Sequence, residues 1–380
     1  MTPIELLWSV PFGRMGGVSP LARRGGLSLR RAIEAAVLPG LQRPPCLVTF
    51  SGGRDSSTVL AIATSVARRE GLPLPIPVTN AFPHVAESME TDWQRLVIDA
   101  VGPPDWQRIE LDDELDVLGT RATDVALRHG VLAPFNAHFL EPIIELGRGG
   151  SVLTGVGGDE LFAPVGRHHL ARTLAGRRRL RPLELPRLVA STAMPISVRR
   201  RRLGRRDMLS YPWLTATGHA ALNAGLRAWD AHESWRWDYA TRTHMWAGRR
   251  LQMHARSTAL LGMDHDALVI NPFMDPVVLA AASDAWGWAG PRNRTTELRA
   301  LVRSDLPDAV LARATKSTFN ATFWTGYGRQ FADAWSGRGL DTNLVDEEAL
   351  RREWSRPQPD AHSFSLLLTA WLADHATRGT

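Results

Sequence analysis

Ser51-Gly52-Gly53-Arg54-Asp55-Ser56-Ser57 is the stretch that decides the fold of this chain. An apolar run at 46–50 precedes it, and a helically spaced segment that ends at Gly71 follows it. The order predicts a strand, a tight loop and the start of a helix. Paired glycines let the backbone approach an anion closely, and the free N–H groups of a helix start favour negative charge. The loop therefore predicts a phosphate site, although it lacks the lysine of the GxxxxGK[ST] loop.

A second glycine-rich loop, Gly155-Val156-Gly157-Gly158-Asp159-Glu160, follows a short apolar run at 151–154. Loops at the carboxyl ends of parallel strands meet at one edge of a sheet, where ligands bind. Asp55 and Asp159 should then converge, and two facing carboxylates are costly unless a cation lies between them. Because Mg²⁺ takes one or two carboxylates plus phosphate oxygens, the two loops together predict a magnesium site. For either loop alone, a glycine turn with a capping aspartate is the alternative.

The remaining pattern indicates an α/β fold. Further strands are predicted at 75–81 and 106–111, and helices at 28–38, 90–101, 115–130 and 136–146. Alternating strands and helices predict a parallel sheet with helices on both faces. Beyond residue 162 helical patterns dominate, for example at 241–261, 276–283 and 296–303. We therefore expect a lead-in at 1–40, an α/β core at 41–165 and a mostly helical part at 166–380.

The composition, with 44% hydrophobic and 22% charged residues, is that of an ordinary soluble globular protein. No apolar run approaches the roughly 20 residues of a membrane-spanning helix. The absence of a signal peptide and the single cysteine, Cys46, suit the cytoplasm and exclude an intramolecular disulfide. A net charge of +6 agrees with a phosphate-rich substrate. The arginine-rich stretch 167–206 is either a solvated surface or a docking surface for an acidic partner or substrate.

Among the 45 lysine and arginine residues, Lys316 is the one lysine. An ammonium is a compact point charge on a flexible stem, whereas a guanidinium is a planar fork. A lone lysine in a chain that otherwise uses arginine indicates a position that requires an ammonium, with chance as the alternative.

Taken together, the two loops and two later segments resemble the synthetase domain of the asparagine synthetase family, which includes β-lactam synthetases and the cyclases that close lasso peptides. The later segments are Asn271-Pro272-Phe273-Met274-Asp275 and Arg313-Ala314-Thr315-Lys316-Ser317-Thr318-Phe319. Glu90 matches the family's acidic residue after the second strand. The resemblance covers roughly residues 30 to 330, and the paired glycine loops in this order are its most specific part.

The resemblance implies an ATP-pyrophosphatase core of the adenine-nucleotide α-hydrolase type, with ATP and Mg²⁺ as cofactors. Such an enzyme adenylates a carboxylate, releases pyrophosphate and transfers the acyl group to an amine. Asp55 and Asp159 would hold the metal. The nucleotide would contact Ser51, Gly52, Gly53, Asp55, Ser56, Ser57, Gly155, Gly157 and Gly158.

Catalytic roles are implied for Lys316, Glu160 and Arg294. Lys316 occupies the position of the family's lysine that stabilises charge on the pyrophosphate, and Arg294 replaces a second family lysine. Substrate contacts are expected from Val156, Glu90, His138 and Asp275, with His138 as the candidate base.

Two departures from the family narrow the expected reaction. The chain begins Met1-Thr2 rather than with the catalytic cysteine of a glutaminase domain, so nitrogen would come from ammonia, a partner protein or a substrate amine. Val156 occupies a position that is glutamate in asparagine synthetases and tyrosine in β-lactam synthetases. Both features favour a ligase of peptide or natural-product biosynthesis, for example one that forms a macrolactam, acting with a carboxylate, an amine and other biosynthetic proteins.

Three other functions stay open at this point. An ammonia-dependent asparagine synthetase, with or without a separate glutaminase, fits the same motifs. An RNA-modifying ATP pyrophosphatase shares the first loop, but that group lacks the second loop and often uses several cysteines, which disfavours a nucleic-acid partner. A non-catalytic protein that kept the fold is disfavoured by the intact set of Asp55, Asp159 and Lys316.

Overall fold

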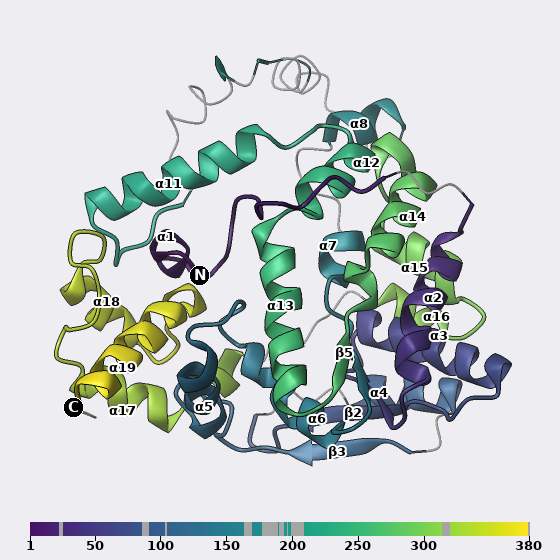
Figure 1. Cartoon of the computed structure of the whole chain (residues 1–380), viewed down its shortest axis with the longest axis horizontal. Helices are drawn as coiled ribbons and strands as arrows, with labels where there is room; N and C mark the ends of the chain where they lie inside the picture. The colour runs from purple at the N-terminus through teal and green to yellow at the C-terminus, as the bar shows by residue number, and fades with distance from the viewer. Residues whose placement is uncertain are drawn as a thin grey trace.

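The structure is a computed structural model that describes residues 1–22, 26–85, 91–102, 105–162, 169–176, 209–313 and 320–378, together with residue 189 and the pairs 194–195 and 197–198. Five parallel strands form one sheet in the order β3-β2-β1-β4-β5. Their bounds are β1 Cys46–Thr49, β2 Ile76–Ala81, β3 Gln107–Glu110, β4 Ser151–Leu153 and β5 Leu268–Ile270. The predicted α/β fold with a parallel sheet is confirmed (Figure 1).

Helices connect and surround these strands. Up to the end of the acidic loop they are α1 Pro3–Leu6, α2 Leu29–Leu41, α3 Arg54–Glu70, α4 Thr91–Val101, α5 Thr120–His129, the 3₁₀ turn η2 Ala137–Leu140, α6 Glu141–Leu146 and α7 Gly158–Phe162. Those that follow are α8 His169–Leu174, α11 Ala216–Ala231, α12 Trp237–Ala240, η4 Thr241–Met245, α13 Arg249–Asp264, η5 Pro272–Met274, α14 Pro276–Trp286, η6 Gly287–Ala289, α15 Arg294–Val302, α16 Asp308–Ala312, η7 Asn320–Phe323, α17 Gly326–Ala334, α18 Glu347–Trp354, η8 Ala361–Ser363 and α19 Phe364–Arg378. The predicted helical C-terminal half is thus confirmed.

Strand β1 lies at the centre of the sheet, where Val48 pairs with Pro77 of β2 and with Leu153 of β4. A strand that is covered on both faces is apolar throughout, as Cys46-Leu47-Val48 is. The edge strand β3 instead alternates exposed and partly buried residues. Strand β5 extends the sheet next to β4. We did not expect β5 from the sequence, because three residues carry almost no periodicity.

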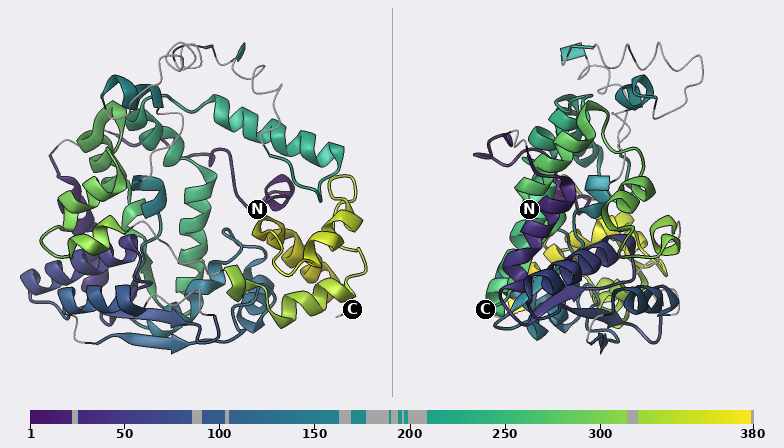
Figure 2. Two further views of the ribbon diagram at one scale, coloured as in Figure 1. Left: turned by 180° about the vertical axis from the view of Figure 1, so that it is seen from behind. Right: turned by 90° about the vertical axis from the view of Figure 1, so that its right-hand side faces the viewer.

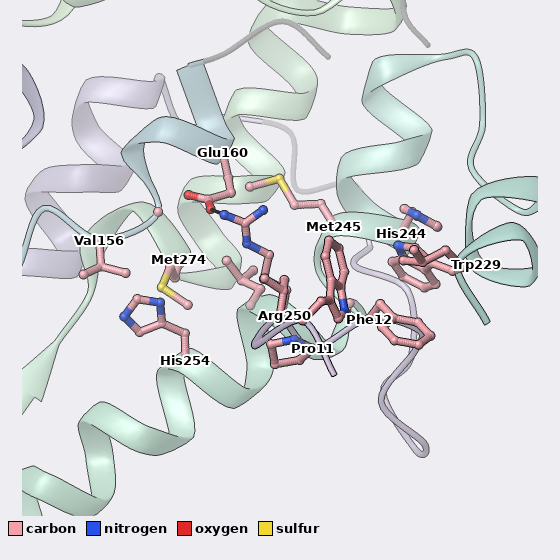
Figure 3. Close-up of a pocket in the computed structure, with 16 residues that line it drawn as sticks. Pro11, Phe12, Val156, Glu160, Trp229, His244, Met245, Arg250, His254 and Met274 are labelled. Atoms are coloured by element: carbon pink, nitrogen blue, oxygen red, sulfur yellow. Dashed lines mark ion pairs between the residues drawn. The ribbon is translucent and has the colours of Figure 1, made fainter. Parts of the chain in front are cut away.

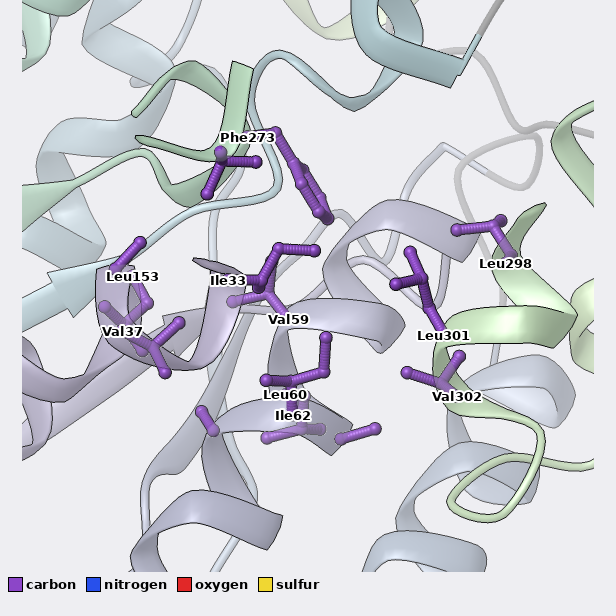
Figure 4. Close-up of a cluster of buried hydrophobic side chains, with 14 of the residues drawn as sticks. Ile33, Val37, Val59, Leu60, Ile62, Leu153, Phe273, Leu298, Leu301 and Val302 are labelled. Carbon is purple, nitrogen blue, oxygen red and sulfur yellow. The ribbon is translucent and has the colours of Figure 1, made fainter. Parts of the chain in front are cut away.

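The largest core packs α2, α3, α14 and α15 against one face of the sheet (Figure 4). Ile33 and Val37 of α2 meet Leu60 of α3 and Leu153 of β4 in this core. Each such side chain contributes about 1.5–3 kcal/mol when it is fully buried. The opposite face is covered by α6 and α13, with Ile143, Ile144 and Leu261 among the buried residues.

A second core lies beside the sheet and holds the two ends of the described chain together. Leu7, next to α1, is buried there with Trp213, Leu350 of α18 and Leu367 of α19. Figures 1 and 2 show α1 among α11, α18 and α19, while α13 stands between this group and α2, α14 and α15. The N-terminal residues therefore cross from one core to the other.

Three predicted helices differ from the observed ones. The segment predicted at 241–261 is divided into the π-helix η4, Thr241–Met245, and α13, which begins only at Arg249. The segment predicted at 115–130 becomes helical only at Thr120, because the Asp116 carboxylate accepts the Leu118 N–H at 2.8 Å and forms a turn instead. The segment predicted at 136–146 is a 3₁₀ turn followed by α6, whose first turn contains Pro142, a position that needs no N–H donor.

The expected division of the chain at residues 40 and 165 stays a proposal. The sheet and its main core draw on all three segments, since α2 comes from the lead-in, and β5 and α14 come from beyond residue 165.

Candidate active site at the carboxyl edge of the sheet

The first loop joins β1 to α3 and is held by side chains that donate to its carbonyl groups. Gln94 Nε2 donates to the Ser51 carbonyl at 3.3 Å, and Arg313 Nη1 donates to the Gly52 carbonyl at 3.4 Å. Gly52 has φ +79°, a conformation that favours glycine. The first N–H groups of a helix have no acceptor within the helix, so the start of α3 is a suitable place for an anion.

The second loop rests on the segment that follows β5. Thr154 Oγ1 donates to Asn271 Oδ1 at 2.6 Å and accepts the Val156 N–H at 3.2 Å. Gly157 has φ +91°, and a Cβ there would lie 2.6 Å from Cγ of Met274. The glycine is therefore required for the loop to lie on this segment.

The two loops touch through glycines. A Cβ on Gly155 would lie 2.8 Å from the Ser56 nitrogen, and a Cβ on Gly158 would lie 2.3 Å from Cγ of Asp55. Gly155 and Gly158 of the acidic loop thus make room for part of the serine loop. This explains why the acidic loop needs glycine at these two positions, and it brings Asp55 close to Asp159.

Arg294, at the first position of α15, bridges the two carboxylates. One guanidinium nitrogen, Nη2, pairs with Asp55 Oδ2, and Nη1 pairs with Asp159 Oδ1 at 2.5 Å. The side chains of Asp55 and Arg294 are 16% and 19% exposed, whereas that of Asp159 is 53% exposed. Burial lowers the pKa of Arg294 and the two carboxylates raise it, with a net rise. The carboxylates converge as expected, with a guanidinium between them.

The donor set agrees with a magnesium ion that is completed by substrate phosphates. Among the residues that the structure describes, no group of three or more histidine, cysteine, aspartate or glutamate side chains could hold a metal alone. Mg²⁺ typically uses only one or two carboxylates and takes the rest of its ligands from phosphates and water. Asp55 and Asp159 are the residues that would hold it.

A cavity of about 580 Å³ opens above the two loops. This volume lies within the roughly 300–1,000 Å³ of small-molecule sites. The lining includes Ser51, Gly53, Asp55, Ser56, Gly155, Gly157 and Asp159 from the loops, Val78–Asn80 from β2, and Arg54, Arg294 and Arg313. Gly52, Ser57 and Gly158 are buried behind it. Burial and the neighbouring Arg294 lower the pKa of Arg54, so a polyanion such as a triphosphate would relieve the crowding of these cations.

Of the other residues predicted for the site, some line the cavity and some lie outside it. Val156 and Glu160 line the cavity, and Glu160 pairs with Arg250 at 3.0 Å. Asp275 accepts the Val277 N–H at 2.7 Å and caps α14. His138 is buried outside the lining, with Nε2 3.1 Å from the Leu115 carbonyl oxygen, and burial lowers its pKa. Lys316, Glu90 and much of the stretch 167–206 lie outside the described residues.

Some lining residues were not predicted from the sequence. His254 and Arg250 stand four positions apart on α13, and that spacing places both on one face of the helix. Burial, and then the charge of Arg250, lower the pKa of His254 to about 4. Ser9, Val10 and Pro11 complete the cavity from the N-terminal segment, for which the sequence carries no signal.

A family model described as asparagine synthase matches residues 28–374 of the 380-residue chain. A comparison with curated proteins found no match. In the described part of the chain no helix combines the length and apolarity needed to cross a membrane.

Proposed function

The chain belongs to the asparagine synthase family, and from that premise we propose that it adenylates a substrate carboxylate with ATP, releases pyrophosphate and transfers the acyl group to an amine. Membership of the family supports ATP-dependent amide-bond formation in general. The observation that carries the finer proposal is that Asp55, in the first turn of α3, and Asp159 meet on either side of Arg294.

In the first step an oxygen of the substrate carboxylate attacks the α-phosphorus of ATP, and the bond to the β-phosphate oxygen breaks. The N–H groups at the start of α3, with Arg54 and Arg313 beside them, neutralise the charge that develops on the departing pyrophosphate. Preorganised donors of this kind contribute about 3–4 kcal/mol each to the transition state. A magnesium ion held by Asp55 and Asp159 would supply further positive charge to the phosphates.

In the second step the amine attacks the carbonyl carbon, the bond to AMP breaks, and the nitrogen loses a proton. The family resemblance assigns charge stabilisation in both steps to Lys316. The described residue just before its segment, Arg313, contacts the serine loop through the Gly52 carbonyl and stacks on Trp93, with Cζ 5.0 Å from the ring centroid. These contacts place Arg313 beside the serine loop, and the role of Lys316 itself rests on the family resemblance.

We assign the reaction to peptide or natural-product biosynthesis, with a substrate that supplies its own amine. The apolar Val156 in the cavity lining supports this, because it offers no charge for a small amino-acid substrate such as aspartate. An ammonia-dependent asparagine synthetase is the second candidate, and it uses the same phosphate chemistry.

Pyrophosphate release tests the proposal. The full chain is mixed with ATP, Mg²⁺ and a panel that contains aspartate with ammonia, single amino acids, and peptides with a free amino terminus and an acidic side chain. We expect pyrophosphate with one member of the panel and its loss in Asp55→Asn and Lys316→Ala. Asp308→Asn, at an exposed ion pair away from the cavity, is the control. Inorganic phosphate as the product, or full activity in Lys316→Ala, would refute the mechanism.

A further inference from the structure

A second, smaller cavity of about 230 Å³ adjoins the nucleotide cavity (Figure 3). The two share lining residues, namely Val10, Pro11, Val156, Gly157, Glu160, Arg250 and His254. Pockets that bind a complete small-molecule ligand measure about 300–1,000 Å³. The smaller cavity therefore suits one group of a larger substrate whose reacting end lies beside the phosphates.

Most of the surface of this cavity is apolar. Trp229 of α11 stacks on His244 with ring centroids 3.5 Å apart and an interplanar angle of 21°. Met245, Leu251 and Met274 add flexible apolar surface. Figure 3 shows Trp229, His244 and Phe12 on one side, and Val156, Met274 and His254 on the side toward the acidic loop. An apolar or aromatic group gains the most free energy in such surroundings.

The charged pair Glu160–Arg250 stands where the two cavities meet, with Glu160 Oε1 3.0 Å from Arg250 Nη2. Because most of the Arg250 side chain is exposed, its remaining donors can reach a polar group of a substrate that passes from one cavity to the other. The arrangement matches an amino acid or peptide, which carries polar backbone groups next to an apolar side chain.

The N-terminal segment forms one wall of the cavity and is firmly attached. Glu5 is buried and pairs with Arg249, with 2.6 Å between Oε1 and Nε, and it also accepts the Phe12 N–H at 3.1 Å. Burial raises the pKa of Glu5, but the Arg249 pair and backbone donors lower it below its ordinary value. The Arg249 N–H donates to the Gly13 carbonyl at 2.9 Å, which ties the segment to the start of α13.

The Phe12 ring can line the smaller cavity because the residue of α11 that it packs against, Gly225, has no side chain. A Cβ on Gly225 would lie 2.4 Å from Cε2 of Phe12. Trp8, Val10, Pro11 and Phe12 together line the cavity, and all four precede the residues that the family model matches. This wall is therefore a feature that the family match does not account for.

We propose that the smaller cavity binds an apolar or aromatic side chain of an amino-acid or peptide substrate, and that residues 8–12 set the size of that side chain. The inference rests on the proposed function, because the shared lining residues place the side chain beside the carboxylate or amine that reacts. It assigns the substrate class that the family membership leaves open.

Ligand-observed NMR by saturation transfer tests the cavity without any reaction. The probes are N-acetylphenylalanine amide and N-acetylglycine amide, added to the full chain. Met245→Trp fills the cavity, and Met263→Trp is the matched control, because Met263 lies on α13 with 77% of its surface exposed. We expect the phenylalanine probe to bind the wild-type chain and Met263→Trp, and to bind Met245→Trp about tenfold more weakly. Gly225→Ala, which displaces Phe12, should weaken the same probe.

Equal binding of the phenylalanine probe to Met245→Trp, Gly225→Ala and the wild-type chain would overturn the inference, as would equal binding of both probes. The two assays together distinguish failure of the proposed reaction from failure of the proposed pocket. Probe binding without pyrophosphate release from any substrate would overturn the reaction and keep the pocket, whereas pyrophosphate release without probe binding would overturn the pocket and keep the ligase.

Discussion

Replacing Arg294 by methionine tests whether the site is built to hold a cation between two carboxylates. In the variant, Asp55 and Asp159 face each other without the guanidinium. Breaking a buried ion pair costs about 3–5 kcal/mol, and breaking an exposed one costs about 0–1 kcal/mol. Because the Asp55 contact is mostly buried and the Asp159 contact is half exposed, we expect a loss of about 2–3 kcal/mol in the free energy of unfolding.

The response of stability to Mg²⁺ distinguishes a site that binds cations from an ion pair with a structural role alone. In Arg294→Met the two carboxylates are released for Mg²⁺, and a ligand that binds only the folded state stabilises it. Urea unfolding with and without Mg²⁺ should therefore show a marked recovery in this variant and a smaller change in the wild-type chain. Arg299→Met, on the same helix and in an exposed pair with Asp308, should show little loss and no response to Mg²⁺. If Arg294→Met behaves like Arg299→Met, the reasoning is wrong.

Three further predictions follow from single contacts. Gly158→Ala places a methyl group 2.3 Å from Cγ of Asp55, so pyrophosphate release should fall about 100-fold, while Gly16→Ala, where the added methyl meets open space, should change nothing. Asp116→Asn should lower the free energy of unfolding by about 3 kcal/mol in urea titrations, because this buried carboxylate accepts N–H groups of Leu118, Thr325 and Gly328; an unchanged midpoint would contradict this. His254 has a pKa of about 4 instead of 6.5, so the unfolded chain binds its proton first and stability should fall as the pH drops from about 6.5 to about 4; His254→Gln should flatten that pH dependence of urea unfolding, and an equal slope in both proteins would refute it.

The sequence predicted the parts of the site that follow from local chemistry. A glycine pair at the end of an apolar run, followed by aspartate and serine, has few structural solutions, and the two such loops converge because parallel strands end at one edge. The glycines that touch Asp55 and Ser56 explain the pattern in steric terms. The family resemblance that these loops carry was confirmed by the match to residues 28–374.

The parts that were not predicted depend on contacts between distant residues. Arg294 was expected in the site as the replacement for a family lysine, but its bridge between two carboxylates was not predicted, because Asp55 lies 239 positions away along the chain. The wall formed by Phe12 depends on Gly225 of another helix. His138 was predicted as a base, but tertiary packing buries it against the Leu115 carbonyl. Strand β5 is too short to show a period.

The most direct test of the central claim follows one oxygen atom. The substrate identified by pyrophosphate release is prepared with a heavy oxygen isotope in its carboxylate and is turned over once with ATP and Mg²⁺. If the carboxylate attacks the α-phosphorus, one heavy oxygen per turnover must appear in AMP when the amine displaces it, and this can be measured by mass spectrometry. Heavy oxygen in inorganic phosphate, or AMP without the label, would contradict adenylation at this site.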